Sequence, residues 1–150
     1  MFLKTRAVLL MLLCAMPDLA PAQSPVFRAE TFAQGLEQPW GMAVLPDGRL
    51  LVTEKPGRLR LVDTAGKVSP PLSGVPPVMA EGQGGLLDVA LHPEFAQNKL
   101  IYFSYAEHQG ANAGTAVAKA QLEERGLGAV QVIWRQSPKL EGGAHFGSRL

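Results

Sequence analysis

The chain has 150 residues, with 14 Lys and Arg against 13 Asp and Glu, so its formal net charge is +1 at pH 7. This balanced charge provides no basic surface for nucleic acid or for an anionic membrane, and we expect neither partner. The single cysteine, Cys14, excludes an intramolecular disulfide.

Residues 1–22 have the pattern of a secretory signal peptide. A positive start with Lys4 and Arg6 is followed by an apolar run over residues 7–16 and by an A-x-A type cleavage site that ends at Ala22. The apolar run is shorter than the roughly 20 residues of a membrane-spanning helix, so we expect no stable membrane insertion. We therefore predict cleavage near Ala22 and a periplasmic or secreted protein whose domain occupies residues 23–150.

From about residue 30 onward the sequence predicts short strands and no helix of useful length, because Gly and Pro recur every few residues. The predicted strands, in chain order, cover residues 41–45, 49–54, 59–63, 87–91, 99–105, 115–122 and 130–136. We predict a type II turn over residues 55–58, in which Gly57 supplies the positive φ. A longer Asn- and Gly-rich loop is predicted over residues 110–114.

The strand pattern repeats along the chain. Pro46-Asp47 and Pro93-Glu94 follow corresponding strands 47 positions apart, and Leu50 and Leu100 are 50 apart, with the extra residues placed in the turn at 96–98. Four short strands per repeat of 40 to 50 residues are typical of a β-propeller blade, although a β-sandwich is the alternative. Residues 23–150 hold about two and a half blades, so we expect the N-terminal part of a larger propeller.

Two glycine-rich motifs place a polar side chain next to a predicted buried strand. The first, residues 82–87, contains Gln83, and the second, residues 144–150, contains His145. Glycine allows positive φ and lets a backbone approach a ligand closely. Because the starts of successive blades surround one central channel, we expect these two side chains to converge.

Three segments occur in order: residues 38–43 (QPWGMA), 82–95 (GQGGLLDVALHPEF) and 145–150 (HFGSRL). With these segments the chain resembles the soluble pyrroloquinoline-quinone-dependent aldose sugar dehydrogenases of the glucose/sorbosone dehydrogenase family, over about residues 27–150. The resemblance implies a six-bladed, exported bacterial quinoprotein. It also implies pyrroloquinoline quinone and calcium as cofactors and an aldose as substrate, with the electron acceptor left open.

The resemblance implies roles for two residues. His145 matches the family's catalytic base, which takes the proton of the anomeric hydroxyl while hydride passes to the quinone and a lactone forms. Gln83 matches a glutamine that hydrogen-bonds near substrate and cofactor. An imidazole titrates near neutral pH, which suits the first role, and an amide both donates and accepts, which suits the second.

Other positions of the motifs carry weaker expectations. Ala144 stands where the glucose-specific branch has an Asp, so the chain looks closer to the broad-specificity aldose branch. We interpret Asp88, His92 and Arg149 as structural, Arg149 as a bridge between blades, and we expect Trp40 to be packed rather than stacked on a cofactor.

The family's calcium ligands and cofactor-carboxylate ligands are expected downstream of Leu150. We therefore expect residues 23–150 alone to be inactive. The three histidines of the chain lack metal-ligand spacing, so we assign no metal ligand here. Two alternatives stay open: a non-catalytic propeller module that binds sugars or proteins, and a metal-dependent propeller hydrolase of lactones.

Overall fold

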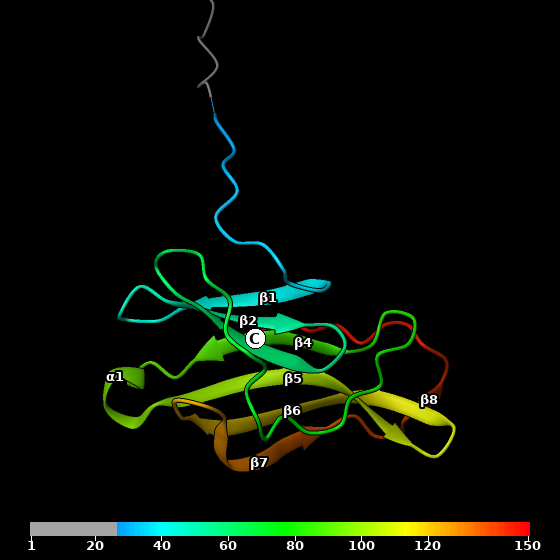
Figure 1. Ribbon diagram of the computed structural model, residues 1–150. Helices are drawn as coiled ribbons and strands as arrows, with labels where there is room; N and C mark the ends of the chain where they lie inside the picture. The colour runs from blue at the N-terminus through cyan, green and yellow to red at the C-terminus, as the bar shows by residue number, and fades with distance from the viewer. Residues whose placement is uncertain (1–26) are drawn as a thin grey trace, which may run out of the picture. The chain divides into compact units, whose positions relative to one another are not determined.

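The computed structural model describes residues 27–150 (Figure 1). The predicted signal peptide, residues 1–22, lies outside the described residues. The chain divides into two units, residues 1–30 and 31–150. The described part of the first unit contains an ion pair between Arg28 and Glu30, with 3.1 Å between nitrogen and oxygen. No helix among the described residues is long and apolar enough to cross a membrane.

Residues 31–150 form two antiparallel sheets, each a meander of neighbouring strands (Figure 1). The first sheet consists of β1 (Pro39–Val44), β2 (Leu50–Glu54) and β3 (Arg58–Val62). The second consists of β4 (Leu86–Leu91), β5 (Leu100–Gln109), β6 (Asn112–Leu122) and β7 (Leu127–Arg135), with the short β8 (Leu140–Glu141) paired to β6. Every predicted strand is present, which confirms the all-β expectation.

The hairpin between β2 and β3 differs from the predicted turn by one residue. The amide of Gly57 donates to the carbonyl of Glu54 at 2.9 Å, so the turn closes over residues 54–57 instead of 55–58. Gly57 still supplies the positive φ, at 98°. In this hairpin Glu54 pairs with Arg58, directly across the turn.

The predicted loop over residues 110–114 is wrong in extent. Gln109 pairs with Asn112, so only Gly110 and Ala111 connect β5 to β6. Asn112 also pairs with Glu141 of β8, which places the start of β6 between two strands. Pairing with a distant strand thus overrides the loop preference of the Asn- and Gly-rich sequence.

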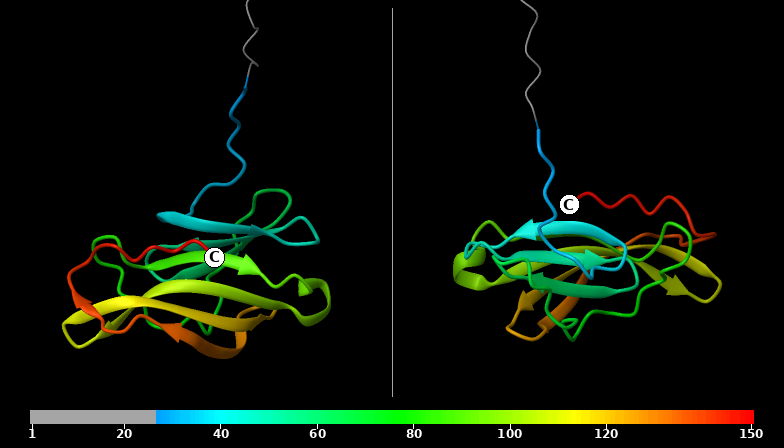
Figure 2. Two further views of the ribbon diagram at one scale, coloured as in Figure 1. Left: turned by 180° about the vertical axis from the view of Figure 1, so that it is seen from behind. Right: turned by 45° about the horizontal axis from the view of Figure 1, so that its top comes forward.

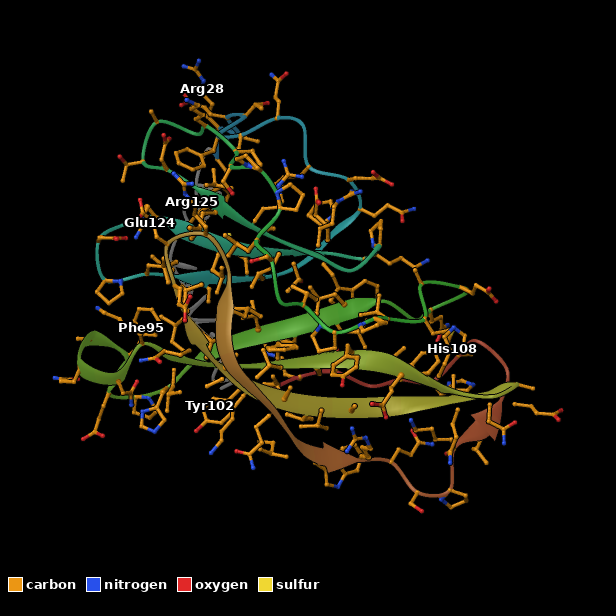
Figure 3. All side chains as sticks on the ribbon, turned by 60° about the horizontal axis from the view of Figure 1, so that its bottom comes forward. Arg28, Phe95, Tyr102, His108, Glu124 and Arg125 are labelled. Atoms are coloured by element: carbon orange, nitrogen blue, oxygen red, sulfur yellow. The ribbon has the colours of Figure 1, made fainter. Side chains whose placement is uncertain are left out.

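A short helix, α1 (Phe95–Asn98), fills the connection between β4 and β5. His92 supports it, because its Nδ1 accepts the amide of Glu94 at 3.0 Å and its carbonyl accepts the amide of Phe95 at 2.8 Å. The His92 ring also stacks on Tyr102, labelled in Figure 3, with 6.0 Å between ring centroids. The structural interpretation of His92 is confirmed.

The first strand of each sheet carries a bulge at the corresponding place. In β1 the register shifts between Pro39 and Met42, and in β4 it shifts between Leu86 and Val89. In each bulge a hydroxyl on the neighbouring strand accepts the displaced amide. The pairs are Gly41 to Thr53 Oγ1 at 2.8 Å and Asp88 to Ser104 Oγ at 3.1 Å.

The bulges confirm the repeat of 47 positions, since Gly41 and Asp88 are 47 apart. The second offset needs correction. Thr53 and Ser104, which occupy equivalent places, are 51 positions apart rather than 50. The four residues of α1 account for the difference between the two offsets.

The main core lies between the two sheets. Its larger members are Leu51, Leu59, Leu61, Leu86, Ile101, Phe103 and Tyr105. A second buried cluster joins Phe146 to residues of the second sheet and the loop before it: Met79, Leu87, Ala106 and Ala113. Phe146 is 6% exposed, so it anchors the segment that follows β8.

A buried carboxylate ends β2. Glu54 accepts the Nε of Arg58 at 2.6 Å, the Nη1 of Arg60 at 3.2 Å and the backbone amide of Glu37 at 2.6 Å. Burial by itself raises the pKa of Glu54. These hydrogen bonds and the two arginine charges outweigh burial and hold that pKa below its usual value. Glu54 thus ties the chain before β1 to the first sheet.

Candidate active site

Gln83 and His145, the two predicted site residues, meet in the structure. The side-chain oxygen of Gln83 accepts the backbone amide of His145 at 2.9 Å, although the residues are 62 positions apart. The backbone amide of Gln83 donates to the carbonyl of Gly143 at 2.6 Å. The predicted convergence of the two motifs is therefore observed, and it runs through the main chain of His145.

The glycines of the first motif allow this approach. Gly82 has a φ of 55°, and a Cβ atom there would overlap the carbonyl of Gly143. Gly85 has a φ of 136°, and a Cβ atom there would overlap the carbonyl of Lys55. A side chain at either position would push the loop before β4 away from one of its neighbours.

Segment 144–150 belongs to no sheet, and side chains hold its backbone instead (Figure 2). Figure 2 shows it in red, running back past β4. Four side chains from other parts of the chain each form one hydrogen bond with the segment. These contacts are Gln83 Oε1 to His145 N at 2.9 Å, Thr115 Oγ1 to Phe146 O at 2.5 Å, Trp40 Nε1 to Ser148 Oγ at 3.3 Å and Asp88 Oδ2 to Leu150 N at 2.8 Å.

Two non-glycine residues of segment 144–150 have positive φ, His145 at 65° and Ser148 at 114°. Such backbones cost free energy for residues with a Cβ atom, and they persist where the surroundings impose them. Strained residues of this kind cluster at functional sites. The backbone that directs the imidazole of His145 is therefore set by its neighbours rather than by its own preference.

The site is open to solvent. Gln83 and His145 are exposed, whereas Phe146 beside them is buried. His145 lines a groove of about 360 Å³ between segment 144–150 and the face of β5, β6 and β7. The bond to His145 uses one of the two lone pairs of the Gln83 oxygen, so this side chain can still accept through its oxygen and donate through its NH₂ group. The pair thus offers a proton acceptor next to a hydrogen-bond donor.

One expectation about a neighbouring residue is wrong. Trp40 is 51% exposed, with its indole nitrogen donating to Ser148, so it is not packed in the core. Arg149 is exposed, lines the same groove as His145 and forms no hydrogen bond or ion pair with residues 27–150, and its role as a bridge between blades stays a prediction. Both side chains face solvent around segment 144–150.

Thr115 is a contributor that the sequence did not reveal. It begins one of the predicted strands, and a threonine there is ordinary, since this residue type is common in strands. Asp88 carried a partial signal, because it stands at the repeat position of Gly41, where the first sheet has no side chain.

Comparison with known proteins places these features in context. The family model for glucose / sorbosone dehydrogenase matches residues 36–150. The chain is 44% identical over 144 residues to the aldose sugar dehydrogenase YliI of Escherichia coli, covering 93% of this chain and 38% of that protein. The chain thus spans little more than a third of the length of the curated relatives it matches.

Two solved structures are similar over most of the described residues. A glucose dehydrogenase is 48% identical, with a TM-score of 0.77, covering 80% of this chain and 36% of its own. The form of an aldose sugar dehydrogenase from Streptomyces coelicolor with pyrroloquinoline quinone (PQQ) bound is 32% identical, with a TM-score of 0.63, covering 73% and 33%. The predicted fold class is confirmed: the protein is all-β, and its sheets are blades of a β-propeller.

Proposed function

Because this chain belongs to the glucose/sorbosone dehydrogenase family, we propose that it carries part of the active site of an enzyme that oxidises aldose sugars at the anomeric carbon to lactones. The observation that supports this most directly is the bond between Gln83 Oε1 and the amide of His145. It joins the two motifs at one exposed place beside a groove.

His145 is the general base in this proposal. Its imidazole accepts the proton of the anomeric hydroxyl, and the bond from Gln83 holds its main chain while it does so. The strained backbone at His145 favours such a role, since a fixed base needs no reorganisation when the substrate binds.

Gln83 binds the reacting partners with its NH₂ group. This group donates to an oxygen of substrate or cofactor, while the amide oxygen accepts the backbone amide of His145. Pyrroloquinoline quinone, when bound, supplies the acceptor for the two electrons removed from the sugar. The site fits such a group in one respect: the exposed side chain of Gln83 offers hydrogen-bond donors to carbonyl oxygens.

Calcium is the second cofactor of the proposal. Residues 27–150 contain no group of three or more His, Cys, Asp or Glu side chains that could hold a metal ion, and we assign none of the calcium ligands to them. Ala144, beside the base, supports acceptance of several aldoses rather than glucose alone. Residues 1–22 support export to the periplasm or beyond.

Replacement of His145 tests the proposal. In the full-length gene product, supplied with pyrroloquinoline quinone and calcium, we expect H145A to lower kcat for aldose oxidation by about 100-fold to 10,000-fold, the range for a lost general base. The assay follows a dye that accepts the electrons. H108Q is the matched control, because His108 is exposed on β5 and does not line the groove that contains His145.

A fluorescence titration with the quinone separates the possible failures. If H145A binds the quinone and keeps its activity within about tenfold of the unchanged protein, His145 is not the base. If the unchanged protein binds sugar but oxidises no aldose, the non-catalytic binding module replaces the proposed enzyme.

A further inference from the structure

We propose that Asp88 is a positioning residue of the candidate active site: its carboxylate fixes the end of segment 144–150 opposite Gln83 and thereby sets the orientation of His145. The inference rests on the proposed role of His145 as the base. Asp88 touches neither of the reacting partners in this scheme and acts through the backbone of the segment.

The bulge in β4 directs the side chain of Asp88 to this task. A bulge bends its strand and changes where a side chain points. The displaced amide of Asp88 donates to Ser104 Oγ at 3.1 Å, and its Oδ2 accepts the amide of Leu150 at 2.8 Å. Asp88 is 8% exposed and forms no ion pair with residues 27–150, so a buried carboxylate is committed to one backbone amide.

The first sheet leaves room for this carboxylate. A Cβ atom at Gly41 would lie 3.1 Å from Oδ1 of Asp88 and 2.9 Å from the carbonyl of Leu87. Any residue larger than glycine would therefore press on the carboxylate. Asp88 is enclosed between β1 on one side and segment 144–150 on the other.

His145 depends on this bond because no strand among residues 27–150 pairs with the segment. Gln83 holds the segment at His145, Thr115 holds it at Phe146 and Asp88 holds it at Leu150. The positive φ of His145 lies at the first of these contacts, and that of Ser148 lies between the last two. When one end is released, a strained backbone relaxes toward its preferred conformation, and the imidazole moves with it.

Hydrogen exchange measured by mass spectrometry tests the contact directly. In the full-length gene product without cofactor, we expect D88A to speed exchange in peptides that span residues 144–150 by about tenfold. D88N retains an acceptor oxygen and should restore most of the protection. D47A is the matched control, because Asp47 is an exposed carboxylate bound to Arg49 in the first sheet.

Kinetics test the positioning role in the same variants. We expect D88A to lower kcat for aldose oxidation by about 10-fold to 100-fold with KM nearly unchanged, as misplacement of a catalytic group does. D88N should recover most of this loss, and D47A should retain full activity. If D88A does not fold, D88G replaces it, since glycine occupies the same bulge in β1.

The outcomes are distinct. Unchanged exchange over residues 144–150 in D88A and D88G overturns the proposal, and so does faster exchange with unchanged kcat. If the unchanged protein oxidises no aldose, the proposed function fails on its own account. Exchange at the amide of His145 then decides alone whether Asp88 positions that residue.

Discussion

The bulges of β1 and β4 have the same register shift and the same hydroxyl acceptor, yet they contact their neighbours in different ways. At Gly41 no side chain is present, and the backbone of β4 packs directly against β1. At Asp88 a carboxylate extends to the amide of Leu150. The same kind of bulge thus allows close packing between the sheets at Gly41 and holds segment 144–150 at Asp88.

The difference shows how a repeated fold acquires a site. The hydrogen bonds that make the bulge come from the strand pair itself, through Thr53 and Ser104, and are retained in both sheets. These bonds use the backbone amide of the bulge residue and do not depend on its side chain. In the second sheet the side chain of Asp88 therefore remains available to contact segment 144–150.

The largest loss of stability is expected when the bulge residues of the two sheets are exchanged. G41D introduces a carboxylate where even a Cβ atom would lie 2.9 Å from the carbonyl of Leu87. We expect destabilisation by about 3 kcal/mol, from overpacking between the sheets. Urea unfolding of the full-length gene product gives the measurement. D88G, which gives β4 the glycine of β1, should shift the midpoint far less, and an equal shift would contradict this reading of Gly41.

Removing the bulge hydroxyls should have a smaller and unequal effect. Thr53 accepts the amide of Gly41 and also donates to the carbonyl of Leu87 at 2.5 Å, whereas Ser104 accepts only the amide of Asp88. T53V should therefore cost about 2 kcal/mol and S104A about 1 kcal/mol, because buried polar groups lose their partners. Unfolding midpoints in urea compare the two, and a larger loss in S104A would reverse the assigned roles.

The smallest expected effects concern the residues next to the bulge hydroxyls, Glu54 and Tyr105. Glu54 faces Pro39 and Tyr105 faces Leu86 at equivalent positions. Burial raises the pKa of Glu54, but the hydrogen bonds and charges of Arg58 and Arg60 outweigh burial and leave that pKa below its usual value of 4.5. Burial raises the pKa of Tyr105 above its usual value of 10, and the charge of Glu107 adds to this.

These shifts predict opposite pH limits for the two residues. The stability that ionised Glu54 contributes is present above pH 4.5 and is lost as the pH falls through its lowered pKa. The stability from neutral Tyr105 is present below pH 10 and is lost as the pH rises through its raised pKa. Urea midpoints against pH should therefore flatten on the acid side in E54Q and on the alkaline side in Y105F. Unchanged slopes would contradict the assignment.

The sequence predicted the strands because their alternation and their Gly- and Pro-rich boundaries are local properties. It failed where the outcome depended on partners distant along the chain. The strand pairing of Asn112 with Glu141 removed a predicted loop. The predicted turn moved for a local reason, because the amide of Gly57 donates to the carbonyl of Glu54. The four-residue helix α1 was too short to leave a periodic signal.

The site was predicted in part for the same reason. Gln83 and His145 stood out through their glycines, and their convergence followed from the repeat. Their chemical roles came from resemblance to a family and stay proposals. The contributions of Thr115 and Asp88 depend on how segment 144–150 lies against β4 and β6, which no local pattern specifies.

Within residues 27–150, His145 is held by its main chain alone, and this affects which nitrogen of its ring can take up a proton. Among residues 27–150, no group forms a hydrogen bond with its imidazole. In many histidine sites a second side chain binds one ring nitrogen and so selects the tautomer. Residues 27–150 select neither tautomer, so a group outside these residues determines which nitrogen stays free to take up a proton.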